Sequence, residues 1–375
     1  MSVIGDTTLS FSEEQAMLMD VAAEFCRDKS PIGEVRAQLE TPTGFDSAIW
    51  DEMVSLGWTG IALPEGSGGS GLGIAALVPV VETMGRAMLG TPLMSTSLAG
   101  QLLLRAAGEN RAEPWLAEIA SGTTATVALL DQGDWGDTNT ALALDADGRL
   151  QGSKRLVPDA GVAAIHAVVA SRQGEPVVAV VRREQLPDGA LAENTLIDQT
   201  KRSANVDFSG VQVAPEAIVE GPAVGAALRD VQLLGSLLVA AEAAGSTGAC
   251  LDTIVDYLKT RKQFGKLIGS YQALKHPAVD ILVALDSARS FVYHAASLLG
   301  EDSLGRDAEI ACRMAKAQAE ETLLYAGDRA VQFHGGMGFT YECDAQLYIR
   351  RAQWSQQQFG DSRHQRKRLA ALLLD

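Results

Sequence analysis

Arg261-Lys-Gln-Phe-Gly-Lys-Leu-Ile-Gly-Ser-Tyr-Gln-Ala-Leu-Lys-His276 lies between two segments with helical periodicity. Apolar residues recur at the spacing of one helix face on both sides of it. Gly265 and Gly269 punctuate the connection, as a helix end and a turn would. The pattern predicts two antiparallel helices joined by a short loop. The apolar positions are Leu251, Ile254, Val255 and Leu258 before the loop, and Leu274, Val279, Ile281, Leu282 and Leu285 after it.

A second motif follows near the end of the chain. It reads Gln332-Phe-His-Gly-Gly-Met-Gly-Phe339, and Tyr348-Ile-Arg-Arg-Ala352 comes after it. The two motifs together resemble the acyl-CoA dehydrogenase family, in the family's order and at its usual spacing. Weaker matches upstream extend the resemblance over nearly the whole chain. They include Pro64-Glu-Gly-Ser-Gly-Gly69 and the segment Leu150–Val157, which resembles the family's strand beside the flavin.

Composition limits the class of protein. The chain has 375 residues, more than one compact core usually holds, so two or three domains are expected. A net charge of −16 argues against a nucleic-acid partner, whose phosphates need a basic face. The four cysteines are far apart, with no disulfide or metal-ligand spacing, as in a cytosolic protein with reduced thiols. We expect a cytoplasmic protein without a signal peptide, a bound metal or a membrane-spanning segment.

The periodicity changes twice along the chain. It is mostly helical to about residue 108, with one helix expected over 46–56 and an apolar stripe of Met17, Val21, Ala22 and Phe25. Short β-rich runs follow between about 123 and 219, and long helical patterns return from about 223. The expected domains are 1–120, 121–222 and 223–375. With the resemblance, the α+β fold class is an N-terminal helical domain, a central antiparallel β-barrel and a C-terminal four-helix bundle.

The resemblance implies an FAD cofactor, because no side chain can accept the hydride of this chemistry. Arg261 suits the FAD pyrophosphate, since a guanidinium can bind phosphate oxygens in pairs. Gln263, Phe264 and Gln272 belong to the same cofactor motif, and the last two match positions that contact the adenosine half. Gln332, Gly335 and Gly336 match the place where a neighbouring subunit's FAD lies, where glycine permits close approach. A simple helix corner with capping glycines is the alternative.

The sequence departs from the family at the catalytic base. Phe359 stands at the usual position of the glutamate, and Gly235 at the position that a minority of members use. Glu242 lies two helical turns after Gly235, on the same face and about 10 Å along the axis. It sits in an apolar run that would raise the pKa of a carboxyl group, as a base needs. Glu242 is therefore the candidate base, with a buried structural pair as the alternative and Asp361 as a weaker candidate.

Two further departures concern the ligands. Ser236 replaces an arginine that many members use for the CoA nucleotide, and Pro158 replaces a threonine that often bonds the flavin. Such a pattern resembles subunits of heteromeric dehydrogenases for bulky, steroid-type CoA esters. Two functions follow: a dehydrogenase that forms a 2,3-enoyl-CoA from a bulky acyl-CoA, or a non-catalytic partner subunit that completes another chain's FAD site. The expected partners are an electron-transfer flavoprotein or similar acceptor, and other subunits in a homo- or heterotetramer.

Overall fold

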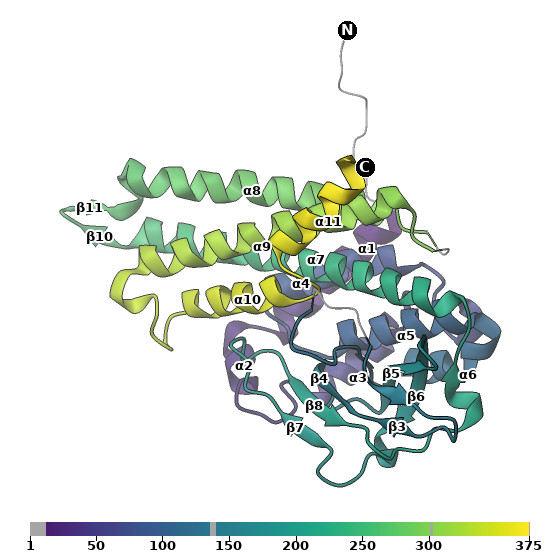
Figure 1. Ribbon diagram of the computed structural model, residues 1–375. Coiled ribbons are helices and arrows are strands. Elements are labelled where there is room, and N and C mark those ends of the chain that lie inside the picture. The colour runs from purple at the N-terminus through teal and green to yellow at the C-terminus, as the bar shows by residue number, and fades with distance from the viewer. Residues whose placement is uncertain (1–12, 136–139, 301–302, 375) are drawn as a thin grey trace.

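The computed structural model describes residues 13–135, 140–300 and 303–374. Helices form the first part of the chain, strands the middle and long helices the last part (Figure 1). This order confirms a helical, then sheet, then helical organisation.

The N-terminal helices pack around α4 and α5, whose residues are almost all buried. The expected helix over 46–56 is α3, and the Asp46 carboxylate caps it by accepting from the Ala48 N–H at 2.9 Å. The prediction that four apolar residues of the first helix form a buried stripe is correct for only two of them. Ala22 and Phe25 are buried, whereas Met17 and Val21 are 60% and 43% exposed. The helices are α1 (Glu13–Lys29), α2 (Ile32–Gln38), α3 (Ser47–Ser55), α4 (Leu77–Arg86), α5 (Leu93–Ala107) and α6 (Glu109–Ala120), with short 3-10 turns η1 (Trp58–Gly60), η2 (Glu65–Ser67) and η3 (Ile74–Ala76).

The strands of the middle region form two sheets, and the described residues contain no closed barrel. One sheet has the order β3-β2-β5-β6-β9, with β1 paired to β5; the other has the order β4-β8-β7. β1 and β2 both run parallel to β5, so the expectation of a purely antiparallel barrel was wrong. The strands are β1 (Ala125–Ala128), β2 (Ala143–Leu144), β3 (Leu150–Gln151), β4 (Ser153–Pro158), β5 (Ile165–Arg172), β6 (Glu175–Arg182), β7 (Leu191–Glu193), β8 (Ser203–Asp207) and β9 (Ile218–Val219), with 3-10 turns η4 (Arg183–Gln185) and η5 (Pro215–Ala217).

The C-terminal helices lie alongside one another, and the α7–α8 connection is the small hairpin of β10 and β11 (Figure 1). This confirms two antiparallel helices around the motif at 261–276. The apolar face expected on the second helix was partly wrong, because Ile281 and Leu285 are buried but Val279 and Leu282 are about half exposed. The elements are α7 (Ala223–Thr260), β10 (Lys262–Gln263), β11 (Lys266–Leu267), η6 (Ile268–Ser270), α8 (Gln272–Ser297), α9 (Arg306–His334), η7 (Gly335–Met337), α10 (Ala345–Gln357) and α11 (Ser362–Leu374).

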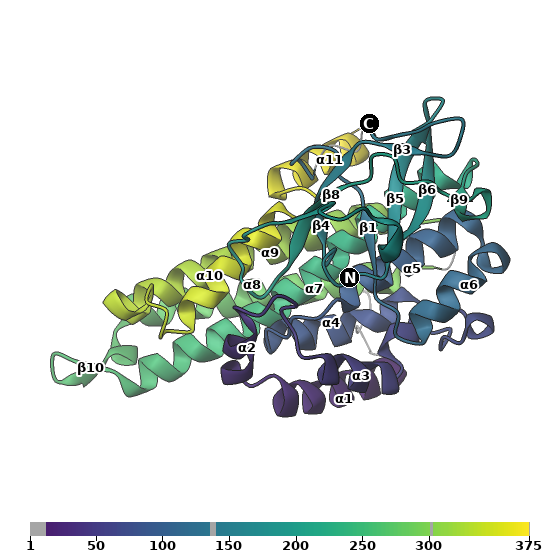
Figure 2. The ribbon, with the colours of Figure 1, turned by 90° about the horizontal axis from the view of Figure 1, so that it is seen from below.

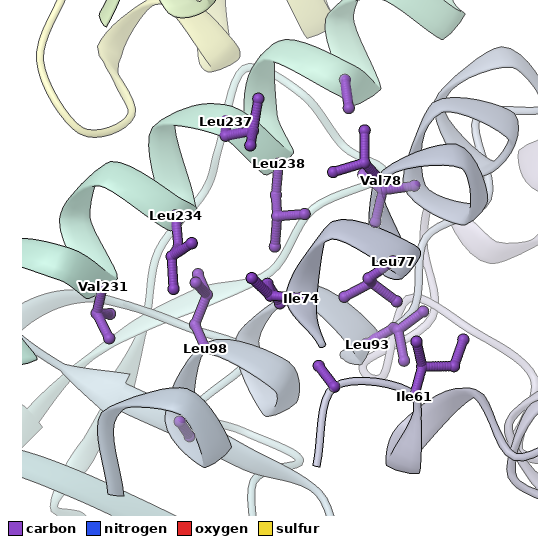
Figure 3. Close-up of a cluster of buried hydrophobic side chains, with 14 of the residues drawn as sticks. Ile61, Ile74, Leu77, Val78, Leu93, Leu98, Val231, Leu234, Leu237 and Leu238 are labelled. Atoms are coloured by element: carbon purple, nitrogen blue, oxygen red, sulfur yellow. The ribbon is translucent and has the colours of Figure 1, made fainter. Parts of the chain in front are cut away.

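Helix α7 joins the N-terminal helices to the C-terminal ones. Its apolar side chains, such as Leu234 and Leu238, pack against those of α4 and α5 (Figure 3). Seen from below, α7 runs the length of the molecule beside α4, with the sheets to one side (Figure 2). By length and composition alone, α7 is long and apolar enough to cross a membrane. Its most apolar stretch is 67% buried inside the protein, as in the core helix of a globular fold.

Glycines allow α4 and α7 to cross closely. A Cβ atom added at Gly85 would lie 2.2 Å from the Glu242 carbonyl oxygen, and one at Gly245 would lie 1.8 Å from that of Glu82. The Ser246 hydroxyl also donates to the Gly85 carbonyl at 2.8 Å. Both positions therefore require glycine, and the crossing fixes the backbone that carries Glu242.

Candidate functional site

The residues expected to bind FAD lie at one end of the C-terminal helices, which we call the hairpin end (residues 261–272 and 332–341). α7 ends at Thr260, and the Arg261 carbonyl accepts from the Ile268 N–H at 2.9 Å, which closes the hairpin. α9 ends at His334, whose ring stacks on Tyr257 with centroids 4.1 Å apart. The stack holds the two helix ends together, so both motifs reach the same end of the molecule (Figure 1).

The candidate side chains of the hairpin end are open to solvent. Arg261 makes no ion pair or hydrogen bond through its guanidinium with any described residue, so its charge is free for an anion. Phe264 is 90% exposed, and the apolar side chains around the two turns are exposed as well. Exposed apolar groups gathered at one end indicate a surface that contacts another molecule. The exposed polar members are Gln263, Gln272 and Gln332, and the further apolar ones are Leu267, Met337, Phe339 and Tyr341.

The glycines of the second motif divide into two kinds. A Cβ atom at Gly338 would lie 2.2 Å from the Val331 carbonyl oxygen, so this glycine is required inside the protein. Nothing lies within 4 Å of a Cβ atom added at Gly335 or Gly336. Gly335 has a φ of +62°, a backbone conformation that favours glycine at this position. Gly336 has no such backbone constraint. Gly336 therefore presents bare backbone to the outside, as a site for close approach of a ligand would.

Gly235 and Phe359 stand at the two positions where the resemblance places a catalytic glutamate, and they face each other. The Phe359 ring lies directly over Gly235: a Cβ atom at Gly235 would come within 2.3 Å of Phe359 Cζ. The ring of Trp135 also packs against Phe359, with centroids 4.9 Å apart and the ring planes tilted by 53°. One aromatic side chain thus fills the space that a glutamate from either position would use.

Phe359 and Trp135 form part of the wall of a small cavity between α5, α7 and the α10–α11 turn, here called the inner cavity. Its volume of about 60 Å³ has room for a few water molecules and not for an acyl chain. Its polar wall combines hydroxyl, carboxylate and ammonium groups. The residues used below are Thr91, Ser95, Trp135, Asp159, Lys201 and Phe359.

Asp159 supplies the carboxylate of the inner cavity, and among the described lining residues it is the only acidic one. It follows β4 directly and accepts a hydrogen bond from the Ser95 hydroxyl at 2.6 Å. Burial raises the pKa of Asp159 to about 6, although the bond from Ser95 and the charges of Lys201 and Arg202 oppose the rise. Sequence reasoning missed this residue. The available signal was an acid immediately after Pro158, the residue expected beside the flavin.

Glu242 lies behind this cavity, in a buried network of charges. Lys201 Nζ donates to Glu242 Oε1 at 2.5 Å, and Arg351 Nη1 lies 3.1 Å from the same oxygen. Arg351, fully buried, also pairs with Asp198 and donates to Thr200. Glu242 Oε2 has no hydrogen-bond partner among the described residues. These contacts correspond to the structural pair considered above. Two cations therefore contact one oxygen of the Glu242 carboxylate, and a catalytic role for Glu242 stays a prediction.

The other candidates have local structural roles. Asp361 caps α11 by accepting from the His364 N–H at 2.8 Å. Ser236 is buried and donates to the Gln232 carbonyl at 2.9 Å. Pro158 lies between the inner cavity and a second one of about 260 Å³, the outer cavity, which reaches Ile197 and Gln357. Trp135, Arg202, Trp354 and Gln358 also line both cavities, so the two spaces adjoin.

Comparison with known proteins identifies the family. Residues 12–123 match the N-terminal domain of acyl-CoA dehydrogenases, and residues 233–374 match their C-terminal domain. Acyl-CoA dehydrogenase IpdE2 of Mycolicibacterium smegmatis is 31% identical over 364 residues, covering 96% of this chain and 99% of the relative. The chain belongs to the acyl-CoA dehydrogenase family. Acyl-CoA dehydrogenases are FAD-dependent oxidoreductases that act on CH–CH groups.

Solved acyl-CoA dehydrogenase structures share the whole fold. The Tcur3481-Tcur3483 steroid ACAD is 26% identical, with a TM-score of 0.83 over 96% of this chain and 98% of that chain. The ChsE4-ChsE5 complex from Mycobacterium tuberculosis is 23% identical, with a TM-score of 0.87 over 98% of this chain and 99% of that chain.

The hairpin end of this acyl-CoA dehydrogenase fits the nucleotide half of FAD. Arg261 is an uncommitted cation, and the bare backbone at Gly336 lies on the same end of the helices. By contrast, one aromatic ring fills the space at the two positions where the resemblance places a catalytic glutamate. The chain therefore combines groups suited to FAD with an aromatic side chain packed on Gly235.

Proposed function

We propose that this chain is one subunit of a heteromeric acyl-CoA dehydrogenase for bulky, steroid-type CoA esters, and that a partner chain supplies the catalytic base. The observation that carries the proposal is the packing of Phe359 on Gly235. Both base positions are apolar, and the inner cavity of about 60 Å³ is too small for a bulky acyl group. Glu242, the remaining candidate on α7, is held by Lys201 and Arg351.

The contribution of this chain to catalysis is then cofactor binding. Arg261 would hold the FAD pyrophosphate, and Phe264 and Gln272 the adenosine half, with Gln263 in the same cofactor motif. Gln332, Gly335 and Gly336 would contact the cofactor of a neighbouring subunit. FAD supplies the acceptor for the hydride that leaves Cβ. The C-terminal helices α7 to α10 serve as a four-helix bundle that presents these groups across a tetramer interface. The exposed apolar residues of the hairpin end support such a contact.

Similarity to a known steroid enzyme supports the substrate class. The Tcur3481-Tcur3483 steroid ACAD is 26% identical to this chain. The proposal therefore places the reaction, formation of a 2,3-enoyl-CoA, in steroid or lipid catabolism in the cytoplasm, with an electron-transfer flavoprotein or similar acceptor as the oxidant. The domains 1–120, 121–222 and 223–375 complete the proposed organisation.

A second candidate function is dehydrogenation by this chain alone. The observation in its favour is the carboxylate of Asp159, which faces the inner cavity and has a pKa near 6. The aromatic wall would have to move before an acyl group could reach it. The residue also has a structural partner in Ser95, which weakens this alternative.

Purification of the chain alone, and co-expression with a candidate catalytic subunit, tests the proposal. We expect no bleaching of the flavin absorbance by any acyl-CoA with the chain alone, and bleaching by bulky acyl-CoA with the co-purified complex. A homomeric preparation that turns over acyl-CoA with an artificial acceptor would overturn the partner role.

A further inference from the structure

The turn between α10 and α11 holds Phe359 in an unusual backbone conformation. Phe359 has a φ of +57°, and Gly360 follows with a φ of +89°. A bulky residue rarely adopts the left-handed region, so surrounding groups must stabilise it. The conformation directs the Phe359 ring into the wall of the inner cavity, onto Gly235 and Trp135.

Lys316, on α9, stabilises this turn from behind. Its side chain is fully buried. Its ammonium donates to the Ser355 carbonyl at 3.0 Å and to the Gly360 carbonyl at 3.4 Å, and it pairs with Glu320. A buried ammonium is costly unless hydrogen bonds and a counter-charge satisfy it. Here two of its acceptors belong to the last turn of α10 and to the residue after Phe359.

Gln365, on α11, stabilises the turn from the other side. Its amide nitrogen donates to the Phe359 carbonyl at 2.7 Å and to the Gly360 carbonyl at 3.2 Å. Its amide oxygen accepts from Arg313 at 2.9 Å, which fixes the orientation of the amide. The Phe359 and Gly360 carbonyls therefore both accept from buried donors, which stabilises the backbone conformation that carries the Phe359 ring.

We propose that Lys316 and Gln365 are positioning residues that hold Phe359 over Gly235 and so keep the inner cavity of this subunit closed to acyl groups. The inference rests on the proposed function, because it explains why this subunit leaves acyl binding to its partner. Neither residue touches a substrate. They act through the Phe359 turn. Gln365 is the one donor to the Phe359 carbonyl among the described residues, so a non-polar residue of similar size would leave that carbonyl without a partner. Loss of Lys316 would remove one of two donors to each of the Ser355 and Gly360 carbonyls, together with the counter-charge of Glu320.

A cysteine reporter in the cavity measures its closure without acyl-CoA or turnover. Thr91 lines the inner cavity, and its hydroxyl has no hydrogen-bond partner among the described residues, so Thr91→Cys changes little else. The four native cysteines are buried, and burial raises the pKa of Cys26 and of Cys312 to about 12. They therefore report unfolding, while the introduced thiol reports opening of the cavity.

The experiment compares the rate of iodoacetamide labelling of this thiol in the full chain, site by site by mass spectrometry. Phe359→Ala should raise the rate by removing the ring. Lys316→Met and Gln365→Leu should each raise it about tenfold or more, because a hydrogen bond from a charged or well-fixed donor shifts an opening equilibrium by that order. Arg105→Met is the matched control: it removes another buried cation, paired with Asp230 at 3.1 Å, away from the cavity.

The outcomes separate the roles. Faster labelling of the reporter, with the native cysteines still protected, supports the proposal. An unchanged rate in folded Lys316→Met and Gln365→Leu, or in Phe359→Ala, overturns it. Labelling of the native cysteines in Lys316→Met means global unfolding, and Gln365→Leu then decides alone. Turnover by the unmodified chain would contradict the proposed function, and labelling would still decide whether the turn closes the cavity.

Discussion

The Phe359 ring occupies the space that a side chain at Gly235 would need, since an added Cβ atom would lie only 2.3 Å from Phe359 Cζ. The two residues belong to α7 and to the α10–α11 turn, far apart in the sequence. A carboxylate side chain at Gly235 would therefore need the space that the Phe359 ring fills. The two departures from the family, Phe359 and Gly235, therefore depend on each other: the aromatic ring fits only because the residue opposite it is glycine.

The first prediction concerns this contact. Gly235→Ala should force the ring out of its place and lower the free energy of unfolding by about 1–3 kcal/mol, as overpacking in a core usually does. Gly225→Ala is the control on the same helix, where nothing lies within 4 Å of an added Cβ. There alanine should be neutral or stabilise by up to about 1 kcal/mol. Urea denaturation of both variants measures the difference, and equal effects would contradict the packing.

The motif at 261–276 predicted its local structure well, because helix periodicity and glycine turns are signals within a few residues. The sequence could not predict the contact between Phe359 and Gly235, although both were recognised as base positions. Only part of the surroundings of Glu242 could be predicted from the sequence. The apolar neighbours on α7 were visible, but the cations Lys201 and Arg351 come from distant segments that only the tertiary fold brings together.

The sheet region shows the same limit. The β-rich region at about 123–219 was predicted where the strands β1 to β9 lie, yet strand order depends on pairing between segments distant in the chain. The parallel pairing of β1 with β5 left no signal in either strand, so the expected antiparallel barrel was wrong. On α8, Val279 and Leu282 matched the helical period and are nevertheless exposed, because periodicity does not tell which face a neighbouring chain covers.

The second prediction separates the two roles of Glu242. Glu242→Gln leaves Arg351 and Lys201 with less negative charge in a buried site, and should lower the free energy of unfolding by about 3 kcal/mol. Asp252→Asn is the control, since its pair with Arg86 is more than half exposed and should contribute at most about 1 kcal/mol. Turnover per folded enzyme in the complex should not change. A fall of about 10²–10⁴-fold with unchanged stability would instead identify Glu242 as the base.

The third prediction is a pH dependence from Asp159. Its pKa is raised from 3.8 to about 6 by burial, so the folded protein binds this proton more tightly than the unfolded chain. Stability from this group is therefore greatest below pH 4 and falls as the pH rises through about 6. Asp159→Asn should remove that fall. At about 1.4 kcal/mol for each pKa unit, the variant should gain roughly 2–3 kcal/mol over the unmodified chain between these limits.

The measurement is the free energy of unfolding of both proteins between pH 4 and pH 8, because the difference cancels the other titrating groups. Asp145→Asn is a control with the opposite sign. The Arg149 backbone N–H, at 2.8 Å, lowers the pKa of the exposed Asp145, so its stabilising effect grows as the pH rises. If the difference in the free energy of unfolding between Asp159→Asn and the unmodified chain stays constant with pH, the pKa of Asp159 is not raised in the folded protein.

The last prediction concerns the hairpin end. Arg261→Ala should weaken FAD binding by roughly 10–100-fold, the order expected when a charged hydrogen bond to phosphate is lost. The melting temperature of the FAD-free protein should not change, because the exposed Arg261 guanidinium makes no ion pair with a described residue. Lys259→Ala, an exposed cation in the last turn of α7, is the matched control and should retain FAD. Equilibrium dialysis with FAD measures the dissociation constants of the purified complexes. Equal affinity in the two variants would exclude Arg261 from the cofactor site, and a loss of FAD from both would indicate a general effect of positive charge rather than a specific contact with the pyrophosphate.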